Sequence, residues 1–466
     1  MNTSNNDTTF VPKRRTAIKV DKVAAVIAPA ISPVDEKPVE VVQLPTPPNT
    51  KNIVNKTSQS KKPRNKPLNI GSFKVKQSDI APMVARVNQG VNSKKTKVAV
   101  DACLLMSITK SGNLNLVGSD REIEIISRTK VTIISGFTKT EKLAVQADRL
   151  NKLLSSFNKN DELEFKIAKN PKVSDGAYHL ALQIKSGKSQ YSLSLFDPEN
   201  YPSLKMSSES VTFKITNNNL LWALQRTLVT SAHQDVRYYL NGVYLELQPQ
   251  DNYIRVVGTD GHRLGTATTE AIFDTKQKSI PVNSVILPRT SITKINSLIG
   301  VDGDCQVIVT NQLLRIATPF VVVTSRLIDG RYPDWRRVVP DVEKNSDYIK
   351  CSLIRSDTKQ VVSRCALMAN EKTTALNFAF NSAKELKISA TNTTDENGIE
   401  SILYTASKVS KANLSLNAAY VHDALNQFDG YDDTIDIYVS DSETAPVVVK
   451  HDANATLTYV VMPLRG

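Results

Sequence analysis

The chain lacks an apolar run long enough to cross a membrane, because no stretch approaches the roughly 20 residues that a spanning helix needs. Cysteine is scarce, with 4 residues in 466, and none of the four has CxxC spacing or a nearby histidine. This usage predicts reduced core thiols in a cytoplasmic protein. The 5 histidines are scattered along the sequence. We therefore expect no metal site and no cofactor.

Glycine is absent from residues 1–70, although this segment holds 9 of the 21 prolines. It carries 12 Lys and Arg against 5 Asp and Glu, so it supplies +7 of the formal charge of +13. Such a composition cannot bury a core and predicts a disordered basic tail. A cleaved targeting peptide is the alternative, since VAAVIAPAI is apolar. Charged residues precede that run and Pro29 and Pro33 break it, which disfavours targeting.

One pattern occurs three times in the rest of the chain. An alternating apolar strand runs into a small residue and then a polar corner at Asp120, Asp260 and Asn392. A stretch with apolar residues at helical spacing follows each corner, and a strand follows each helix. The first two copies close on a Tyr-Pro corner at Tyr201 and Tyr332. The sequence therefore predicts an α+β fold of three similar domains, with helices on one face of antiparallel sheets. We place the domains at 71–203, 204–342 and 343–466.

Cations recur on the presumed helices of all three copies. They are Arg86, Arg149, Lys152, Arg226, Arg289, Lys294, Arg355, Lys359 and Arg364. On a single helix such charges usually form a solvated face. Repeated on equivalent helices, they favour a continuous basic surface that binds nucleic-acid phosphates without reading sequence.

Four segments carry a family resemblance: AHQDVRYYLNG, TDGHRLG, LIDGRYPDWRRVVP and the terminal YVVMPLR. In this order they resemble the beta subunit of the bacterial replicative DNA polymerase, the sliding clamp, from about residue 73 to 466. The resemblance implies three clamp domains per chain and a head-to-tail homodimeric ring of six domains, with helices lining a central hole. It implies a non-catalytic processivity factor that is cytoplasmic and nucleoid-associated. The implied partners are encircled DNA, a second copy, the replicative polymerase catalytic subunit, the clamp loader and other proteins with clamp-binding motifs, but no membrane.

The same resemblance implies a peptide-binding cleft between the second and third domains. Its matching positions are Leu240, Thr259, Gly261, His262, Arg263, Leu264, Pro333, Arg337, Val338, Val460, Met462, Pro463, Leu464 and Arg465. Apolar walls and an adaptable methionine suit a site for varied peptides. The alternative is that these residues are interdomain core. Ala445 and Pro446 depart from the family near the rim of the cleft, where a hydroxyl is frequent.

The resemblance also implies contacts with DNA and a dimer seam. The DNA residues are Lys94, Arg149, Gln234, Arg237, Tyr238, Tyr239 and Arg289, in which rings beside cations can stack bases. The seam pairs Tyr191 and Leu193, on an edge strand of the first domain, with Leu367 and Met368 of an opposing helix in the third. Ordinary core packing is the alternative for the tyrosine pair and for the seam residues.

Three further signals are discounted. Residues 192–196, SLSLF, are similar to a client motif but lie where an edge strand is expected and begin with serine in place of glutamine. Asp260 and His262 suggest a catalytic dyad, although the family does no chemistry there. The GKS at 187–189 lacks the upstream glycine of a phosphate loop and predicts a hairpin turn.

Two rival functions remain open from the sequence. A nuclease would need clustered carboxylates or histidines to hold a metal. A plasmid- or phage-encoded clamp-like decoy would bind clamp clients without encircling DNA, and its mass in solution would distinguish it.

Overall fold

The computed structural model describes residues 71–91, 99–137, 140–169, 180–274, 281–381, 384–408, 410–431 and 433–464. The predicted tail lies outside these residues, as do Lys94 and Arg465. Within the described part, no helix is long and apolar enough to cross a membrane.

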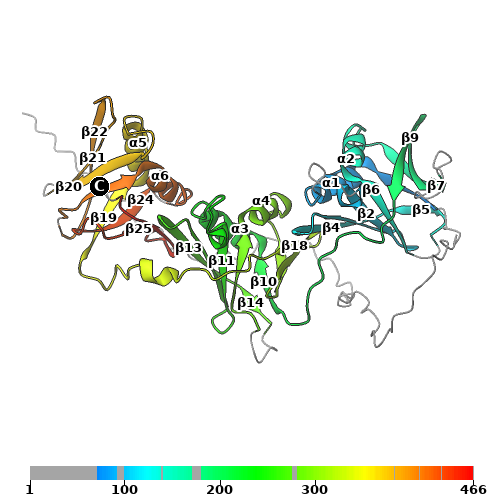
Figure 1. Cartoon of the computed structure of the whole chain (residues 1–466), viewed down its shortest axis with the longest axis horizontal. Helices are drawn as coiled ribbons and strands as arrows, with labels where there is room; N and C mark the ends of the chain where they lie inside the picture. Colours follow the sequence, from blue (N-terminus) through cyan, green and yellow to red (C-terminus); the bar gives the residue numbers. More distant parts are fainter. Residues whose placement is uncertain are drawn as a thin grey trace, which may run out of the picture. The chain divides into compact units, whose positions relative to one another are not determined.

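The first domain alternates long antiparallel strands with two helices (Figure 1). Its elements are β1 (Ser72–Lys76), α1 (Gln77–Asn88), a 3-10 turn (Ala99–Ala102), β2 (Cys103–Ile108), β3 (Asn113–Ser119), β4 (Ile123–Lys130), β5 (Thr132–Ser135), β6 (Glu141–Gln146), α2 (Ala147–Ser155), β7 (Glu162–Lys169), β8 (Leu180–Ser186) and β9 (Ser189–Phe196). The glycine at 187 starts the tight turn between β8 and β9 with a φ of 55°, so the predicted hairpin is confirmed.

The second domain repeats this order. Its elements are β10 (Val211–Thr216), α3 (Asn217–Leu228), the 3-10 turn η2 (Tyr238–Leu240), β11 (Gly242–Gln248), β12 (Tyr253–Thr259), β13 (Arg263–Glu270), β14 (Ile272–Phe273), β15 (Ser284–Pro288), α4 (Arg289–Leu298), β16 (Asp304–Val309), β17 (Leu313–Ala317), β18 (Val321–Arg326) and the 3-10 turn η3 (Trp335–Val338). Tyr238 and Tyr239, two of the predicted DNA residues, lie in the short turn η2.

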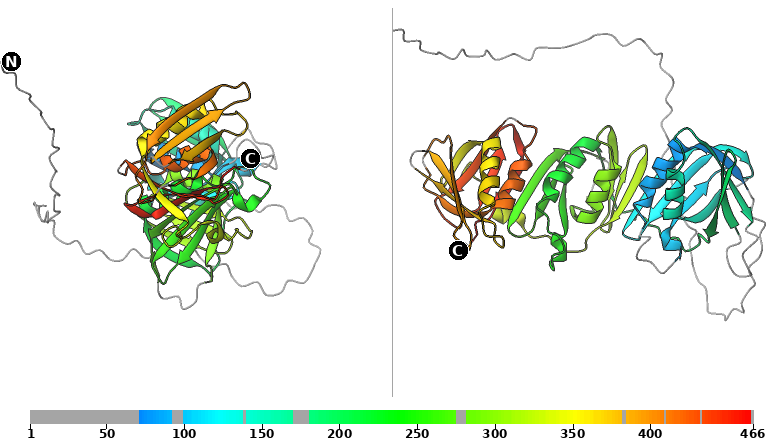
Figure 2. Two further views of the ribbon diagram at one scale, coloured as in Figure 1. Left: turned by 90° about the vertical axis from the view of Figure 1, so that its left-hand side faces the viewer. Right: turned by 90° about the horizontal axis from the view of Figure 1, so that it is seen from above.

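The third domain has the same succession and ends on a long strand. Its elements are β19 (Tyr348–Ile354), α5 (Arg355–Ala366), β20 (Ala375–Phe380), β21 (Glu385–Thr391), β22 (Asn397–Leu403), β23 (Asn413–Asn417), α6 (Ala418–Asn426), β24 (Thr434–Ser440), β25 (Val447–His451) and β26 (Asn454–Val461). In the view of Figure 2 from above, the two helices of each domain lie side by side on one face of the strands. The predicted α+β class and the threefold repeat are confirmed.

The three corners share one local structure. The Oδ1 atom of Asp120 accepts from the backbone N–H of Ile123 (2.8 Å), and Oδ1 of Asp260 accepts likewise from Arg263 (3.1 Å). In the third domain, Oδ1 of Asn392 accepts from the N–H of Thr394 (2.9 Å). A side-chain oxygen that closes a turn on its own backbone explains why only Asp and Asn stand at these corners.

The small residue before each corner is required by helix packing. A Cβ on Gly118 would lie 2.2 Å from the carbonyl oxygen of Val87 on α1, and one on Gly258 would lie 2.2 Å from that of Thr227 on α3. Glycine therefore lets the first helix of each domain lie directly against the strand. The third copy has the next smallest residue, Ala390, which is buried.

The Tyr-Pro corners are also equivalent. The Tyr201 hydroxyl donates to the Val117 carbonyl (2.9 Å), and the Tyr332 hydroxyl donates to the Val257 carbonyl (3.3 Å). Each acceptor lies three residues before its domain's corner aspartate. The two tyrosines therefore donate hydrogen bonds to equivalent strands, β3 and β12, in two successive domains.

Sheets continue from one domain into the next. Strand β4 of the first domain pairs antiparallel with β18 of the second, with Glu124 opposite Thr324. Strand β13 of the second domain pairs with β26 of the third, with Leu264 opposite Val460. Because backbone hydrogen bonds join the domains directly, the sites at these junctions are held by the sheet itself.

Candidate functional site: a basic hollow and an apolar cleft at the junction of the second and third domains

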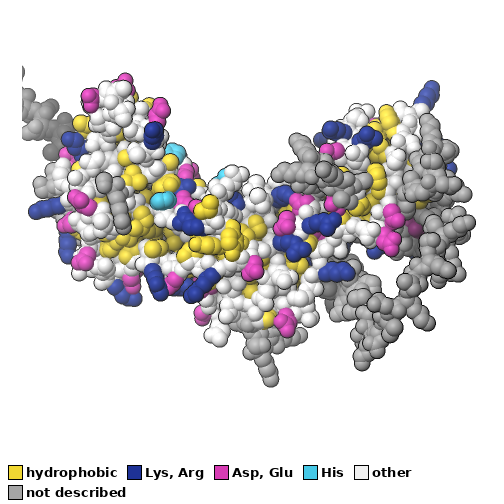
Figure 3. All heavy atoms as spheres, in the orientation of Figure 1, with side chains coloured by type: hydrophobic (Ala, Val, Ile, Leu, Met, Phe, Trp, Pro, Cys, Tyr) yellow, Lys and Arg dark blue, Asp and Glu magenta, His cyan; other side chains and the backbone are white. Residues whose placement is uncertain are grey.

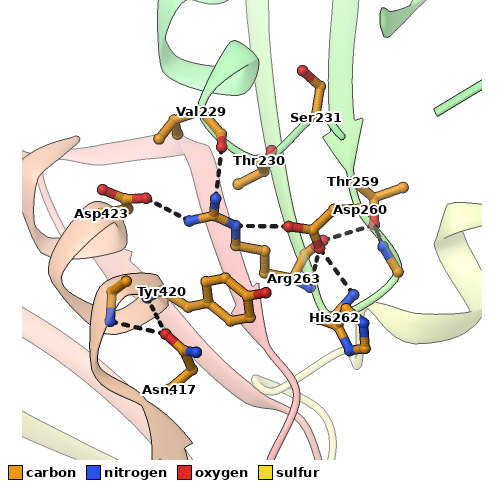
Figure 4. A network of polar contacts seen from close by, with 12 residues as sticks. Val229, Thr230, Ser231, Thr259, Asp260, His262, Arg263, Asn417, Tyr420 and Asp423 are labelled. Carbon is orange, nitrogen blue, oxygen red and sulfur yellow. Dashed lines mark hydrogen bonds and ion pairs between the residues drawn. The ribbon is translucent and has the colours of Figure 1, made fainter. Parts of the chain in front are cut away.

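Arg263 is the centre of a polar network between the second and third domains (Figure 4). Its Nε contacts Oδ2 of Asp260 (3.0 Å), and its Nη1 contacts Oδ2 of Asp423 on α6 (2.5 Å). Nη2 donates to the Val229 carbonyl (3.0 Å) at the end of α3. The guanidinium also lies over the ring of Tyr420, 4.4 Å from its centroid. With its side chain only 14% exposed, this predicted cleft residue holds two domains together.

Helix α6 presents Tyr420 and Asp423 to this network because its first turn is capped. The side chain of Asn417 accepts hydrogen bonds from the N–H groups of Ala419 (2.9 Å) and Tyr420 (3.2 Å). Residues three apart on a helix share a face, so Tyr420 and Asp423 reach the same neighbour.

A hollow of about 490 Å³ opens beside Arg263. It is lined by Val229, Ser231, Ala232, His233, Gln234, Asp235, Arg237, Asp260, His262, Arg263, Arg289 and Tyr420. The hollow brings together three of the predicted DNA residues, Gln234, Arg237 and Arg289, with two predicted cleft residues, His262 and Arg263. Three guanidinium groups face two carboxylates around its wall, so it is suited to anionic groups.

The cations of this hollow have partners within the chain. Arg237 forms two contacts with Asp235, from Nε to Oδ1 (3.0 Å) and from Nη2 to Oδ2 (2.8 Å). Hydrogen bonds from Arg237 hold the pKa of the Asp235 carboxyl at about 2. Arg289 Nη1 donates to the carbonyl of Leu228 (2.6 Å) and the hydroxyl of Ser231 (2.8 Å). Burial, and then the nearby Arg263, lower the pKa of Arg289.

The two tyrosines of η2 differ in exposure. Tyr238 is 57% exposed, whereas Tyr239 is half-buried against the apolar cluster at the domain junction. Their rings meet edge to face with centroids 5.7 Å apart. Tyr238 is therefore the ring that is free to stack on a base, while the packing interpretation fits Tyr239 better.

The floor of the predicted cleft is a separate apolar cluster. Leu240 and Leu264 are each 2% exposed and Val460 is 1% exposed. They pack with Tyr332 and Trp335. At these three positions the interdomain-core interpretation holds, because side chains this buried leave almost no surface for a peptide to contact. Thr259 is also buried, and its hydroxyl donates to the carbonyl of Arg263 (2.7 Å).

The rim of the cleft is exposed. Val338 is 43% exposed, Pro333 is exposed and the side chain of Arg337 is 83% exposed. The opposite rim, Met462, Pro463 and Leu464, is half-buried. Figure 3 shows hydrophobic side chains gathered over β13 and β25, beside this junction. The structure joins Leu240, Leu264 and Val460 in one apolar cluster and bonds Met462 to His262, whereas the place of Pro333, Arg337 and Val338 in the same cleft stays a prediction.

Backbone hydrogen bonds hold the C-terminal rim in place. The N–H of Met462 donates to the carbonyl of His262 (2.9 Å), and the N–H of Leu464 donates to that of Ser415 (2.7 Å). At the departing position Pro446, the carbonyl accepts from the Tyr348 hydroxyl (3.1 Å), and Ala445 beside it is half-buried. Gly261 occupies the corner with a φ of 92°, a conformation that favours glycine.

Several of the helix cations contact carboxylates or a carbonyl of the same chain. These contacts reduce the predicted basic surface. These contacts are Lys294 Nζ to Asp120 Oδ2 (3.2 Å), Arg364 Nη2 to Glu400 Oε2 (2.5 Å), Arg355 Nη2 to Asp433 Oδ1 (3.6 Å) and Arg226 Nη1 to the Asn426 carbonyl (3.4 Å). By contrast, Arg149 and Lys152 on α2 are exposed. These two are better placed than the paired cations to contact phosphates.

One strand edge carries two of the predicted seam residues, and a second open edge lies in the third domain. Strand β9 pairs with β8 along its length but with β6 only at Leu195 and Phe196. It is therefore an edge over Ser189–Ser194, where Tyr191 is 41% exposed and Leu193 is half-buried. In the third domain, β22 is the last strand of a four-stranded sheet.

Apolar side chains surround the β22 edge. Leu403 is 76% exposed and Ile399 is 57% exposed on this strand. Leu367, 76% exposed, and the half-buried Met368 follow directly after α5. Exposed apolar side chains beside an open edge are typical of a strand that pairs with another chain. The sequence reasoning missed Ile399 and Leu403, although their alternation within β22 was a readable signal.

The remaining chemistry signals have structural explanations. Segment 192–196 lies in β9, and Asp260 binds the backbone of His262 (2.9 Å) in its turn. Among the described residues, no group of three or more His, Cys, Asp or Glu side chains could hold a metal ion. Tyr420 and Asp423 were also missed, since only their three-residue spacing on a predicted helix connects them.

Comparisons with known proteins match nearly the whole described chain. Models of the N-terminal, central and C-terminal domains of the DNA polymerase III beta subunit match residues 72–205, 210–334 and 336–465. The beta sliding clamp of Proteus mirabilis is 29% identical over 364 residues, covering 78% of this chain and 91% of the relative. That of Escherichia coli K12 is 28% identical over 394 residues, covering 84% of this chain and 99% of the relative.

Solved structures give the same result. A sliding clamp from Pseudomonas aeruginosa bound to griselimycin has a TM-score of 0.74 at 25% identity, covering 85% of this chain and all (100%) of that one. The DNA polymerase III subunit beta of the same organism has a TM-score of 0.73 at 26% identity, covering 84% and 100%. The chain belongs to the DNA polymerase III beta subunit family, the bacterial sliding clamps.

Proposed function

We propose that two copies of this chain form a head-to-tail ring of six domains that encircles duplex DNA. The observation that carries the proposal is the pair of unlike open edges: β9 in the first domain and β22 in the third. Pairing β9 of one copy with β22 of the other is a heterologous contact, and a ring closes when two such contacts are made. The proposed seam consists of Tyr191, Leu193, Leu367 and Met368, with Ile399 and Leu403 added.

A ring held topologically needs no strong bond to DNA. Exposed Arg149 and Lys152 supply loose phosphate contacts, as does Lys94, which lies outside the described residues. Gln234, in the wall of the hollow, and the exposed Tyr238 are contacts for single-stranded template. Arg237 and Arg289 contribute through the charge they bring to the hollow, because their donors are partly committed to Asp235 and to the end of α3.

The cleft residues receive clamp-binding peptides. Partners of this kind are the replicative polymerase catalytic subunit, the clamp loader and other proteins with clamp-binding motifs. The exposed Pro333 and Val338 and the adaptable, half-buried Met462 suit apolar peptide side chains. Leu240, Leu264 and Val460 form the apolar core of the junction. The chain is thus a non-catalytic processivity factor of the polymerase, in the cytoplasm and at the nucleoid, with domains at 71–203, 204–342 and 343–466. No observation favours the decoy function.

Retention on DNA of different topology tests the ring. The protein is loaded onto nicked circular DNA by its clamp loader with ATP, and half of the sample is then linearised with a restriction enzyme. Gel filtration should find the clamp on circles and not on linear molecules, and native mass measurement should give a dimer. Equal loss from both templates, or a monomer at micromolar concentration, contradicts topological binding.

A further inference from the structure

The rim of the cleft belongs to a short segment, 332–338, that alternates anchored and projecting residues. Tyr332 and Trp335 are each 8% exposed. Tyr332 stacks on Tyr244 of β11 with centroids 5.0 Å apart. Between and after these anchors, Pro333 and Val338 are exposed at the cleft. The position of the rim therefore depends on what holds Tyr332 and Trp335.

Two guanidinium groups lie over the ring of Trp335. The Arg336 guanidinium carbon is 4.5 Å from the centroid of the indole, and that of Arg255 on β12 is 5.4 Å away. Stacking of guanidinium on indole is favourable, but it fixes the ring only if the cations themselves are fixed.

Glu246 on β11 fixes both cations. Its Oε1 accepts from Nη2 of Arg336, and its Oε2 lies 3.7 Å from Nη1 of Arg255. Arg255 is held further by its Nε donating to the Thr268 hydroxyl (3.2 Å). The Glu246 side chain is only 12% exposed, so this carboxylate acts in a partly desolvated place where ion pairs are stronger than at the surface.

We propose that Glu246 is a positioning residue of the peptide cleft, which holds Arg255 and Arg336 over the Trp335 ring and so sets Pro333, Arg337 and Val338 for the client. The inference deepens the peptide binding proposed above and rests on it. Glu246 does not itself line the cleft, so its effect on the peptide passes through the rim.

The test uses the full-length protein and a fluorescent peptide Gln-Leu-Ser-Leu-Phe, which is segment 192–196 with glutamine at its first position. Binding is followed by anisotropy. Of the 2 tryptophans in the chain, Trp222 is replaced by Phe, so that emission reports Trp335 alone. Glu246→Ala should weaken peptide binding at least fivefold and make Trp335 more accessible to acrylamide. Glu246→Gln retains an acceptor for Arg336 and should recover most of the affinity.

Two further variants complete the design. Arg336→Ala removes one of the two cations that lie over Trp335. Because the Arg336 side chain is 51% exposed, the fold should be retained, and peptide binding should weaken similarly. Asp341→Ala removes an exposed ion pair to Lys344 that lies just after the segment 332–338. It should leave the peptide affinity and the quenching of Trp335 unchanged.

The outcomes separate the two proposals. Wild-type affinity in Glu246→Ala and Arg336→Ala overturns the positioning role. Weaker binding without greater quenching of Trp335 also overturns it, because Glu246 would then act otherwise than through the rim. Failure of the wild type to bind the peptide defeats the proposed function, whereas the quenching comparison still tests whether Glu246 fixes Trp335.

Discussion

Arg263 on β13 and Asp423 on α6 form an ion pair, 2.5 Å from Nη1 to Oδ2, that joins the second domain to the third. The same guanidinium binds Asp260 and the Val229 carbonyl. Arg263 therefore serves the cleft by fixing the two domains that form it, and a peptide would meet a side chain whose donors are already occupied.

Replacing Arg263 by Ala should lower the free energy of unfolding by about 2 kcal/mol, less than for a fully buried pair because the Asp423 side chain is 33% exposed. Arg263→Lys should be intermediate, since one ammonium cannot replace the three bonds of the fork. Urea unfolding measures the change, with Lys344→Ala, at an 87% exposed side chain, as the control. Equal midpoints for Arg263→Ala and the control would show that the network adds no stability.

Leu367→Asp should convert the dimer to monomers at micromolar concentration, because an unpaired charge in a desolvated seam costs on the order of 3 to 5 kcal/mol. Leu367 is 76% exposed in the single chain, so its replacement leaves the domain folded. Ile272→Asp changes a similarly exposed residue, at 71%, on the edge strand β14 and should remain a dimer. Sedimentation velocity distinguishes the two. A dimeric Leu367→Asp protein would place the seam elsewhere.

Truncating Met462 and Leu464 to Ala should weaken peptide binding about tenfold to a hundredfold, since a fully buried apolar side chain contributes roughly 1.5 to 3 kcal/mol. Both residues hold their strand through backbone N–H groups, which Ala retains. The dimer and the melting temperature should therefore be unchanged. Anisotropy with the same labelled peptide gives the affinity, and undiminished binding would exclude this cleft.

The cysteines predict a loss of stability at alkaline pH. Burial raises the pKa of Cys103, Cys305 and Cys351 from 9.0 to about 12. A thiol whose pKa is raised in the folded state contributes stability below its unfolded pKa, and this contribution is lost as the pH rises from about 9 towards 12. The melting temperature should be level from pH 7 to 8.5 and should fall above pH 9. Replacing Cys305 by Ala should make that fall shallower.

Thiol titration gives an independent check of the same burial. All four cysteines are buried thiols. At pH 8, Ellman's reagent should find no reactive thiol in the native protein and 4 after denaturation. A rapidly reacting native thiol would contradict the burial.

Deleting the basic tail should change DNA association alone. Residues 1–70 carry +7 and lie outside the described residues. Their loss should weaken DNA binding at low salt and flatten its salt dependence, because fewer counterions are released. The dimer and the peptide affinity should not change. Identical salt slopes for the full-length and shortened proteins would indicate a passive tail.

Local patterns in the sequence predicted most of the fold. The corners at Asp120, Asp260 and Asn392 and the small residues before them are local, because each closes a turn or admits a helix within one domain. The positions of the cleft came from the family resemblance, and the structure places Leu240, Leu264 and Val460 in one apolar cluster at the domain junction. Glu246 and Trp335 could not be connected, since they are far apart in the sequence and neither type signals an anchor by itself.

The sequence also could not predict which helix cations form ion pairs within the chain. A lysine on a predicted helix looks the same whether it faces solvent or, like Lys294, a carboxylate of the preceding domain. Only the packing of one domain against the next decides which cations remain free, and that packing depends on strand pairs such as β4 with β18.

The corner residues also record how the three copies have diverged. In the first two domains Oδ1 closes the turn, and Oδ2 meets a cation, Lys294 for Asp120 and Arg263 for Asp260. Asn392 closes the same turn, but its Nδ2 donates to Glu396 within its own domain. The corner of the third copy thus makes a hydrogen bond where the corners of the other two make an ion pair. Position 392 therefore needs an acceptor oxygen for the turn and a donor for Glu396, and Asn supplies both, whereas Asp would set a second carboxylate against Glu396.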